Sequence, residues 1–173
     1  GYKRIGFVMT YSRGGIGHKL FASSFLYYSM LIRESKRIPI LSKSEISSEN
    51  IEKWMKEHEP DVVISDGSVY KILVDLGYKI PEDLGFAALD TAKGPDDASG
   101  VDHRHEVVGR EAFKLALSDI NLNSKGIPKS PKVVLVDSHY QTGSTLRRVG
   151  KTLDVRIRAA TYHDSDGGVT LLK

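Results

Sequence analysis

Length, composition and charge indicate an ordinary globular domain and exclude several other classes of protein. The chain has 173 residues, of which 40% are hydrophobic and 27% are charged, so it is long enough to bury a sizeable core. It contains no cysteine, which excludes a disulfide framework and a thiolate-bound metal. The net charge of +3 comes from scattered basic residues, which favours a solvated surface over a nucleic-acid footprint. No apolar run could span a bilayer and no signal peptide is recognisable, so we expect a cytoplasmic protein without membrane contact.

Strand and helix patterns alternate along the chain. Continuous apolar runs are typical of strands buried on both faces, and they predict strands at residues 5–10, 38–41, 62–65, 85–89 and 132–137. Apolar residues at helical spacing predict helices between them, with N-caps at Ser48, Ser68 and Asp102 and a C-terminal glycine at Gly77. This order predicts the α/β fold class, an open parallel sheet flanked by helices on both faces.

Polar side chains follow several of the predicted strands. In an open parallel sheet, ligands bind beyond the carboxyl ends of the strands, so these residues are the candidates for a binding site. Carboxylates and arginine suit a polyol, because each makes paired hydrogen bonds to adjacent hydroxyls. For each single residue, the alternative interpretation is a helix cap or a turn. The predicted effector-binding residues are Ser12, Arg13, Ser65, Asp66, Asp90, His103 and His105.

Motifs for catalysis, cofactors and metals are weak or missing. The glycines of residues 14–17 resemble a phosphate loop, but they match neither the P-loop nor the dinucleotide-binding spacing. His103 and His105 are two residues apart, and no second anchored pair completes a metal site. No G-x-S-x-G elbow accompanies the serines and histidines. We therefore predict no catalytic residue, no cofactor and no metal.

A Gly-x-x-x-Pro-Glu-Asp signature lies within residues 76–90 (LGYKIPEDLGFAALD), where a strand and Asp90 follow it. This segment resembles the LacI/GalR family of transcriptional regulators. Residues 2–8 (YKRIGFV), 61–67 (DVVISDG), 100–117 (GVDHRHEVVGREAFKLAL) and 132–148 are similar to further segments of that family. Residues 123–131 (NSKGIPKSP) are similar to a subgroup of xylose-operon regulators.

The resemblance implies a periplasmic-binding-protein-like fold of type I, with two α/β lobes around a sugar and an N-terminal helix-turn-helix head that binds DNA. Residues 1–148 match the C-terminal lobe plus a strand that crosses back to the first lobe, and residues 149–173 form a tail. We therefore expect DNA contact only through a head that this chain lacks.

Carried over by position, Asp90 matches the family aspartate that closes on sugar hydroxyls, and Asp66 with Ser65 matches the turn that supplies a second polar contact. His103 and His105 match the segment at the pocket mouth. Other positions depart from the family: Ser-Asp-Gly at 65–67 replaces the usual Asn-Asp pair, Thr91 replaces a second aspartate, Thr142 stands where an arginine is usual, and the arginine of the first helix has no clear match. These departures leave open whether the effector differs from the common sugars or the pocket has lost its ligand.

The main hypothesis is the ligand-sensing and dimerisation domain of a LacI-family repressor or other regulator, which is not an enzyme. In the family, the helix after the third strand contributes to dimerisation, which implicates Val69, Leu73 and Leu76, although core burial explains the same stripe. A solute-binding protein for sugar transport is the alternative, because it shares the fold. A small α/β enzyme that uses residues 14–17 is the third hypothesis.

Overall fold

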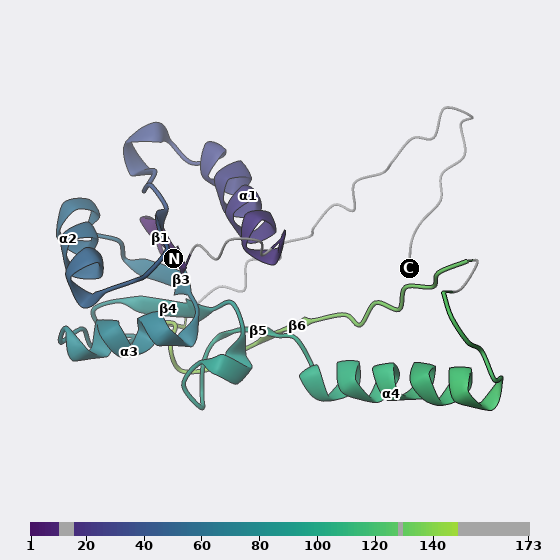
Figure 1. Ribbon diagram of the computed structural model, residues 1–173. Helices are drawn as coiled ribbons and strands as arrows, with labels where there is room; N and C mark the ends of the chain where they lie inside the picture. The colour runs from purple at the N-terminus through teal and green to yellow at the C-terminus, as the bar shows by residue number, and fades with distance from the viewer. Residues whose placement is uncertain (11–15, 128–129, 149–173) are drawn as a thin grey trace.

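Six strands form a single sheet in the computed structural model, which describes residues 1–10, 16–127 and 130–148 (Figure 1). The strands are β1 (Ile5–Thr10), β2 (Leu41–Lys43), β3 (Val62–Ser65), β4 (Gly85–Ala88), β5 (Gly100–Asp102) and β6 (His139–Gln141). They lie in the order β2-β1-β3-β4-β5-β6. Neighbours from β2 to β5 pair in parallel, whereas the edge strand β6 runs antiparallel to β5. The predicted α/β class is confirmed, and the antiparallel edge is a feature that the sequence did not predict.

Helices cover both faces of this sheet. Because side chains alternate along a strand, Phe7 and Val8 of β1 point to opposite faces. Val8 packs into the core with α2 (Ser48–His58) and α3 (Gly67–Asp75), whereas Phe7 stacks on Phe25 of α1 (Ile16–Met30), with ring centroids 5.0 Å apart. Two 3-10 turns, η1 (Glu34–Lys36) and η2 (Thr91–Lys93), lie in the connections. None of the described helices is long and apolar enough to cross a membrane.

The helix α4 (His105–Asn121) leaves the sheet instead of covering it. Figure 1 shows it extending away from the other elements, and none of its residues is buried. Phe113 and Ile120 are 67% and 73% exposed. Within the described residues, these apolar side chains of α4 therefore gain little from burial.

The core lies between the sheet and the pair of helices α2 and α3. Val63 and Phe86, at the centre of the sheet, have no exposed surface. Trp54 of α2 lies against β1 at Gly6, where a Cβ atom would be only 2.4 Å from the indole. Its Nε1 donates a hydrogen bond to the carbonyl of Pro39 at 3.0 Å. The glycine therefore permits the close approach that buries the largest side chain of the core.

The N-caps of α2 and α3 lie one and two residues before the predicted positions. Ser47, not Ser48, caps α2 by accepting an amide of the first turn. Asp66, not Ser68, caps α3. Both errors have one cause, because a second residue of capping type lies one or two positions before the predicted one, and periodicity does not distinguish them. Gly77 follows α3 with φ of 91°, the left-handed conformation expected of a C-terminal glycine.

The long helix also starts later than predicted. Asp102 ends β5, and its Oδ1 accepts the backbone N–H of Arg104 at 2.7 Å. Arg104 has a left-handed backbone with φ of 53°, and α4 begins at the next residue. The strand β5 was not predicted, because three residues are too few to show a period.

The predicted strand at residues 132–137 is wrong. No strand is assigned there, and Val133 and Leu135 are 81% and 86% exposed. The edge strand is β6 instead, in which Tyr140 pairs with Val101 of β5. An apolar run predicts burial but does not supply the neighbour with which a strand must pair.

The apolar stripe of α3 belongs to the core rather than to a surface. Val69 and Leu73 have no exposed surface, and Leu76 packs against the same core cluster. Side chains buried within the lobe are not available to a second copy. Core packing therefore accounts for Val69 and Leu73, whereas Leu76 is only partly buried.

A buried hydroxyl joins the last described residues to the sheet. Thr145 is 3% exposed. Its Oγ1 donates to the carbonyl of Phe86 at 2.7 Å and accepts the N–H of Ser99 at 2.9 Å. A buried polar group that loses its partner costs more free energy than the bond itself contributes, so Thr145 should be sensitive to removal of its hydroxyl.

We expect the substitution Thr145→Val to lower the free energy of unfolding by about 1–3 kcal/mol, because the backbone groups of Ser99 and Phe86 lose their partner in the core. Ser144→Ala is the matched control, since Ser144 is exposed and its hydroxyl contact is long at 3.4 Å. Urea unfolding measures both variants. An equally small decrease in the free energy of unfolding of both variants would contradict the proposed role of the Thr145 hydroxyl.

Candidate effector-binding site

A cavity of about 660 Å³ opens at the carboxyl ends of the central strands. This volume lies within the range of small-molecule sites in proteins. The wall combines apolar side chains from β1 and α1 with charged side chains from α3 and η2. The lining residues are Phe7, Met9, Thr10, Phe21, Asp66, Gly67, Ser68, Lys71, Leu89, Asp90, Lys93 and His103.

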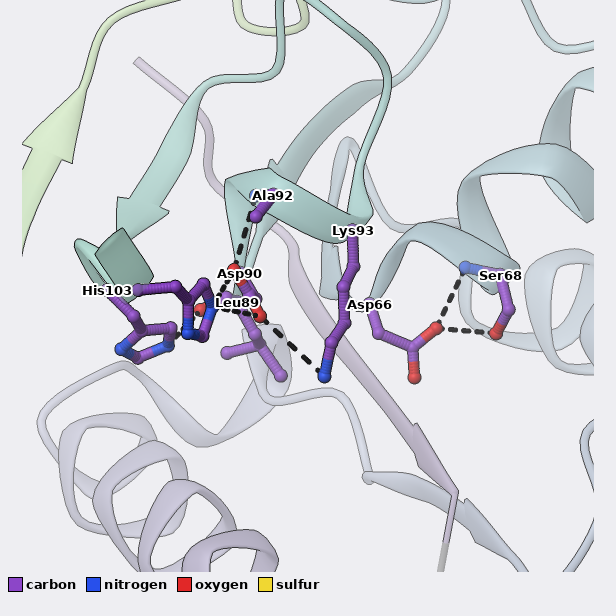
Figure 2. A network of polar contacts seen from close by, with 8 residues as sticks. Asp66, Ser68, Leu89, Asp90, Ala92, Lys93 and His103 are labelled. Carbon is purple, nitrogen blue, oxygen red and sulfur yellow. Dashed lines mark hydrogen bonds and ion pairs between the residues drawn. The ribbon is translucent and has the colours of Figure 1, made fainter. Parts of the chain in front are cut away.

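The pairing of β3 with β4 brings Asp66 and Asp90 to the same edge of the sheet. The strands are parallel, and Ser65 is in register with Ala88. Asp66 follows β3 directly, and Asp90 comes two residues after β4. The N–H of Leu89 extends the pairing by donating to the carbonyl of Ser65 at 2.9 Å. Both carboxylates line the cavity, as the sequence led us to expect of parallel strands (Figure 2).

Asp66 has a structural role and keeps one oxygen available. Its Oδ1 accepts the backbone N–H of Ser68 at 2.9 Å and also the hydroxyl of that residue. Figure 2 shows both bonds on the same oxygen. Within the part of the chain that the structure describes, Oδ2 has no hydrogen-bond partner. The carboxylate therefore caps α3 with one oxygen while the second can accept a bond from a ligand.

Asp90 is more enclosed and more heavily hydrogen-bonded. Its side chain is 12% exposed. Oδ1 accepts the N–H of Ala92 at 3.2 Å, and Nε2 of His105 lies 3.2 Å from Oδ1 and 3.1 Å from Oδ2. The ammonium of Lys93 lies 3.7 Å from Oδ2. The carboxylate is thus held in place by His105 of α4 and by groups of η2, which Figure 2 shows beside it.

These contacts set the ionisation of Asp90. Burial alone raises its pKa, but the hydrogen bond from His105, the bond from the amide of Ala92 and the charges of His105 and His103 lower it. The net effect leaves the pKa of Asp90 below its ordinary value of 3.8. At neutral pH, Asp90 is therefore an acceptor-only carboxylate.

The two histidines beside Asp90 have different positions. His103 lines the cavity, and its Nε2 lies 2.9 Å from the carbonyl of Leu89. Because a carbonyl only accepts, Nε2 carries the proton and Nδ1 is left for other partners. His105 is not among the lining residues. It contacts the site through Asp90 instead, with its ring centroid 5.8 Å from that of His103.

One further predicted residue, Ser65, is buried in the sheet and does not line the cavity. Ser65 has no exposed surface, and its hydroxyl donates to the carbonyl of Val8 at 2.7 Å across β3 and β1. Ser12 and Arg13 lie outside the described residues. The structure thus brings together Asp66, Asp90 and His103 around one cavity.

Sequence reasoning missed two lysines and an aromatic residue of the cavity. Lys93 lies on η2. Lys71 lies one turn after the start of α3, on the side of Asp66. Phe21 reaches the cavity from α1. The spacing of Lys93 three residues after Asp90 was a usable signal, since it places the two on one face of a helical turn.

The fold of the chain is shared with solved regulators of transcription. A LacI-family transcriptional regulatory protein from Corynebacterium glutamicum superposes with a TM-score of 0.59 at 20% identity, over 84% of this chain and 59% of that protein. A LacI family transcriptional regulator from Enterococcus faecium with bound ribose matches with a TM-score of 0.53 at 15% identity, over 84% and 57%. The transcription regulator CcpA of Lactococcus lactis matches with a TM-score of 0.53 at 14% identity, over 85% and 57%.

The chain has the fold of LacI-family transcriptional regulators. It spans less than three fifths of the length of these three structures. No protein-family model matches the chain, and no curated protein sequence matches it. The LacI-type fold is therefore established by structure, while the xylose-operon-like subgroup remains a prediction.

We expect the substitution His105→Ala to raise the pKa of Asp90, because it removes the largest of the effects that lower this pKa. The depressed pKa stabilises the fold above the unfolded value of about 3.9, and this stability is lost as the pH falls through the folded-state pKa. The wild type should therefore be more stable than the variant above about pH 4, with the difference vanishing in stronger acid.

Carboxyl ¹³C NMR across a pH titration measures this pKa directly. His139→Ala serves as the control, because His139 pairs with Asp102 at 3.4 Å and does not contact Asp90. An unchanged pKa of Asp90 in His105→Ala would show that the contact between the two side chains does not form.

Proposed function

We propose that the chain is the effector-sensing part of a LacI-type transcriptional regulator and that its cavity binds a sugar or a related polyhydroxylated molecule. One observation supports this above all. Asp66 and Asp90 line a single cavity at the carboxyl edge of the sheet, in a fold shared with regulators of which one holds ribose. The resemblance of residues 76–90 to the LacI/GalR signature agrees with the same assignment.

The lining of the cavity suits a sugar. Carboxylate oxygens accept hydrogen bonds from hydroxyl groups, and the two lysines, Lys71 and Lys93, supply donors. Phe7 and Phe21 present apolar surface on which the C–H face of a sugar ring can lie. Small-molecule sites in general combine such an apolar wall with a few placed polar groups. The proposed contacts are Asp66, Asp90 and His103 from the lobe, with Ser12 and Arg13 as further predicted contacts.

In the full-length regulator, the effector would act by shifting a population. A ligand held between two lobes favours one lobe arrangement over the other, and the difference in affinity drives the change. The exposed apolar side chains of α4 fit this picture, because a first lobe in the rest of the protein would cover them. We expect the assembled regulator to be a homodimer that contacts DNA through a helix-turn-helix head.

The alternatives have less support. A solute-binding protein would share the fold, but the matched structures described above are transcription regulators. An enzyme that uses residues 14–17 would need a built phosphate site, and Gly14 and Gly15 lie outside the described residues. Within the described residues, no cluster of side chains is suited to hold a metal. Because the matched structures are regulators, we propose ligand sensing rather than catalysis.

We expect titration calorimetry with a panel of pentoses and hexoses, D-ribose among them, to give saturable binding to the intact protein. Asp66→Asn should weaken this binding about tenfold, which corresponds to about 1.4 kcal/mol, because a charged acceptor is lost. The same variant should change the free energy of unfolding by less than about 0.5 kcal/mol, since asparagine caps a helix as well as aspartate does.

Asp75→Asn is the matched control for that experiment, because Asp75 lies at the other end of α3 and is exposed away from the cavity. It should bind the sugar like the wild type. Unchanged affinity in Asp66→Asn would contradict the proposed contact, and no binding of any sugar in the panel to the wild type would contradict the proposed effector class.

A further inference from the structure

The carboxylate that is proposed to receive the effector already has a partner on both of its oxygens. Nε2 of His105 lies between them, at 3.2 Å from Oδ1 and 3.1 Å from Oδ2. The N–H of Ala92 takes a further position on Oδ1. A pair of adjacent hydroxyls would bond to both oxygens of Asp90 at once. Ala92 and His105 already fill the two acceptor positions of Oδ1, so a ligand that bonds to both oxygens must displace one of them there.

His105 is also the first residue of α4, a helix with few other ties to the lobe. No residue of α4 is buried, and its N-cap residue, Arg104, makes no capping bond with its side chain. The remaining side-chain bonds of the described α4 residues, Arg110 to Glu106 and Lys114 to Glu111, lie within the helix itself. Among the described residues, His105 thus provides the side-chain bond from α4 to the cavity wall.

We propose that His105 is a positioning residue that holds Asp90 in the ligand-free protein, and that an effector reaches this carboxylate by displacing it. The displacement releases the first turn of α4 from the cavity wall. Binding in the cavity is thereby linked to the placement of a helix that leaves the sheet (Figure 1). This inference rests on the proposed function for its ligand, but the tie between His105 and Asp90 is testable without any ligand.

Removal of His105 should therefore affect ligand binding in the opposite direction to removal of a residue that contacts the ligand. A contact residue adds bonds to the ligand, so its removal weakens binding. A residue that occupies the binding carboxylate competes with the ligand, so its removal strengthens binding, as expected when a closed state must first open. Lys93 provides the comparison, because it also approaches Asp90, at 3.7 Å, but lies on η2 and has no link to α4.

Amide hydrogen exchange in the ligand-free protein tests the tie. The N–H of Val108 donates to the carbonyl of Arg104 at 3.0 Å, so its protection reports on the first turn of α4. We expect His105→Ala to speed exchange at Val108 and Gly109 several-fold when Asp90 is present, and to have no effect in the Asp90→Ala background. This double-mutant cycle of His105→Ala and Asp90→Ala separates the effect of the contact between the two side chains from any change in helix propensity.

Two further variants make the result specific. His105→Gln keeps a side-chain N–H that can donate to the carboxylate, so it should restore protection close to the wild-type level. Lys93→Ala should leave exchange at Val108 unchanged. Equal acceleration by His105→Ala with and without Asp90 would overturn the tie, because the effect would then come from the helix alone.

Binding of D-ribose, or of whichever panel sugar the wild type binds, tests the displacement. We expect His105→Ala to bind the sugar about three- to tenfold more tightly than the wild type, and the sugar to speed exchange at Val108 in the wild type. Weaker binding by His105→Ala, or slower exchange on saturation, would overturn the proposal and make His105 a direct contact. Absence of sugar binding to the wild type would refute the proposed function instead, while the ligand-free exchange cycle still decides the role of His105.

Discussion

The parallel register of β3 with β4 brings Asp66 and Asp90 to one cavity, on which the proposed binding site depends. Because Ser65 pairs with Ala88, the chain leaves both strands at the same edge, and Asp66 and Asp90 line one cavity there. The buried core beneath, with Val63 and Phe86 fully enclosed, holds that register, since a slip by one residue would turn these side chains to the opposite face. The site therefore depends on the packing of the sheet more than on any single loop.

Much of this arrangement followed from simple sequence patterns. The continuous apolar runs at residues 5–10 and 62–65 coincide with β1 and β3. A strand that is buried on both faces needs apolar side chains at nearly every position. The rule that ligands bind beyond the carboxyl ends of parallel strands led to Asp66 and Asp90, and both line the cavity. Gly77 was predicted to end a helix, and it has the left-handed backbone that this position requires.

What the sequence did not predict depends on contacts between distant residues. Apolar residues 132–137 form no strand, because composition does not reveal whether a neighbouring strand is present. One error is local instead: Asp66 caps α3 in place of Ser68, because the helix begins at Gly67. The contact of His105 with Asp90 joins residues 15 positions apart. Only the path from β5 through Arg104 into α4 brings them together, and no local pattern encodes that path.

A titration of the ¹⁵N-labelled protein with D-ribose, followed by amide chemical shifts, tests the central claim most directly. The amides of Ser68 and Ala92 donate to Asp66 and Asp90, so they report on the two carboxylates separately. If both carboxylates face one sugar, the two amides shift together along a single saturation curve. Saturable binding that moves neither amide, or shifts only one of them, would show that Asp66 and Asp90 do not form a common site.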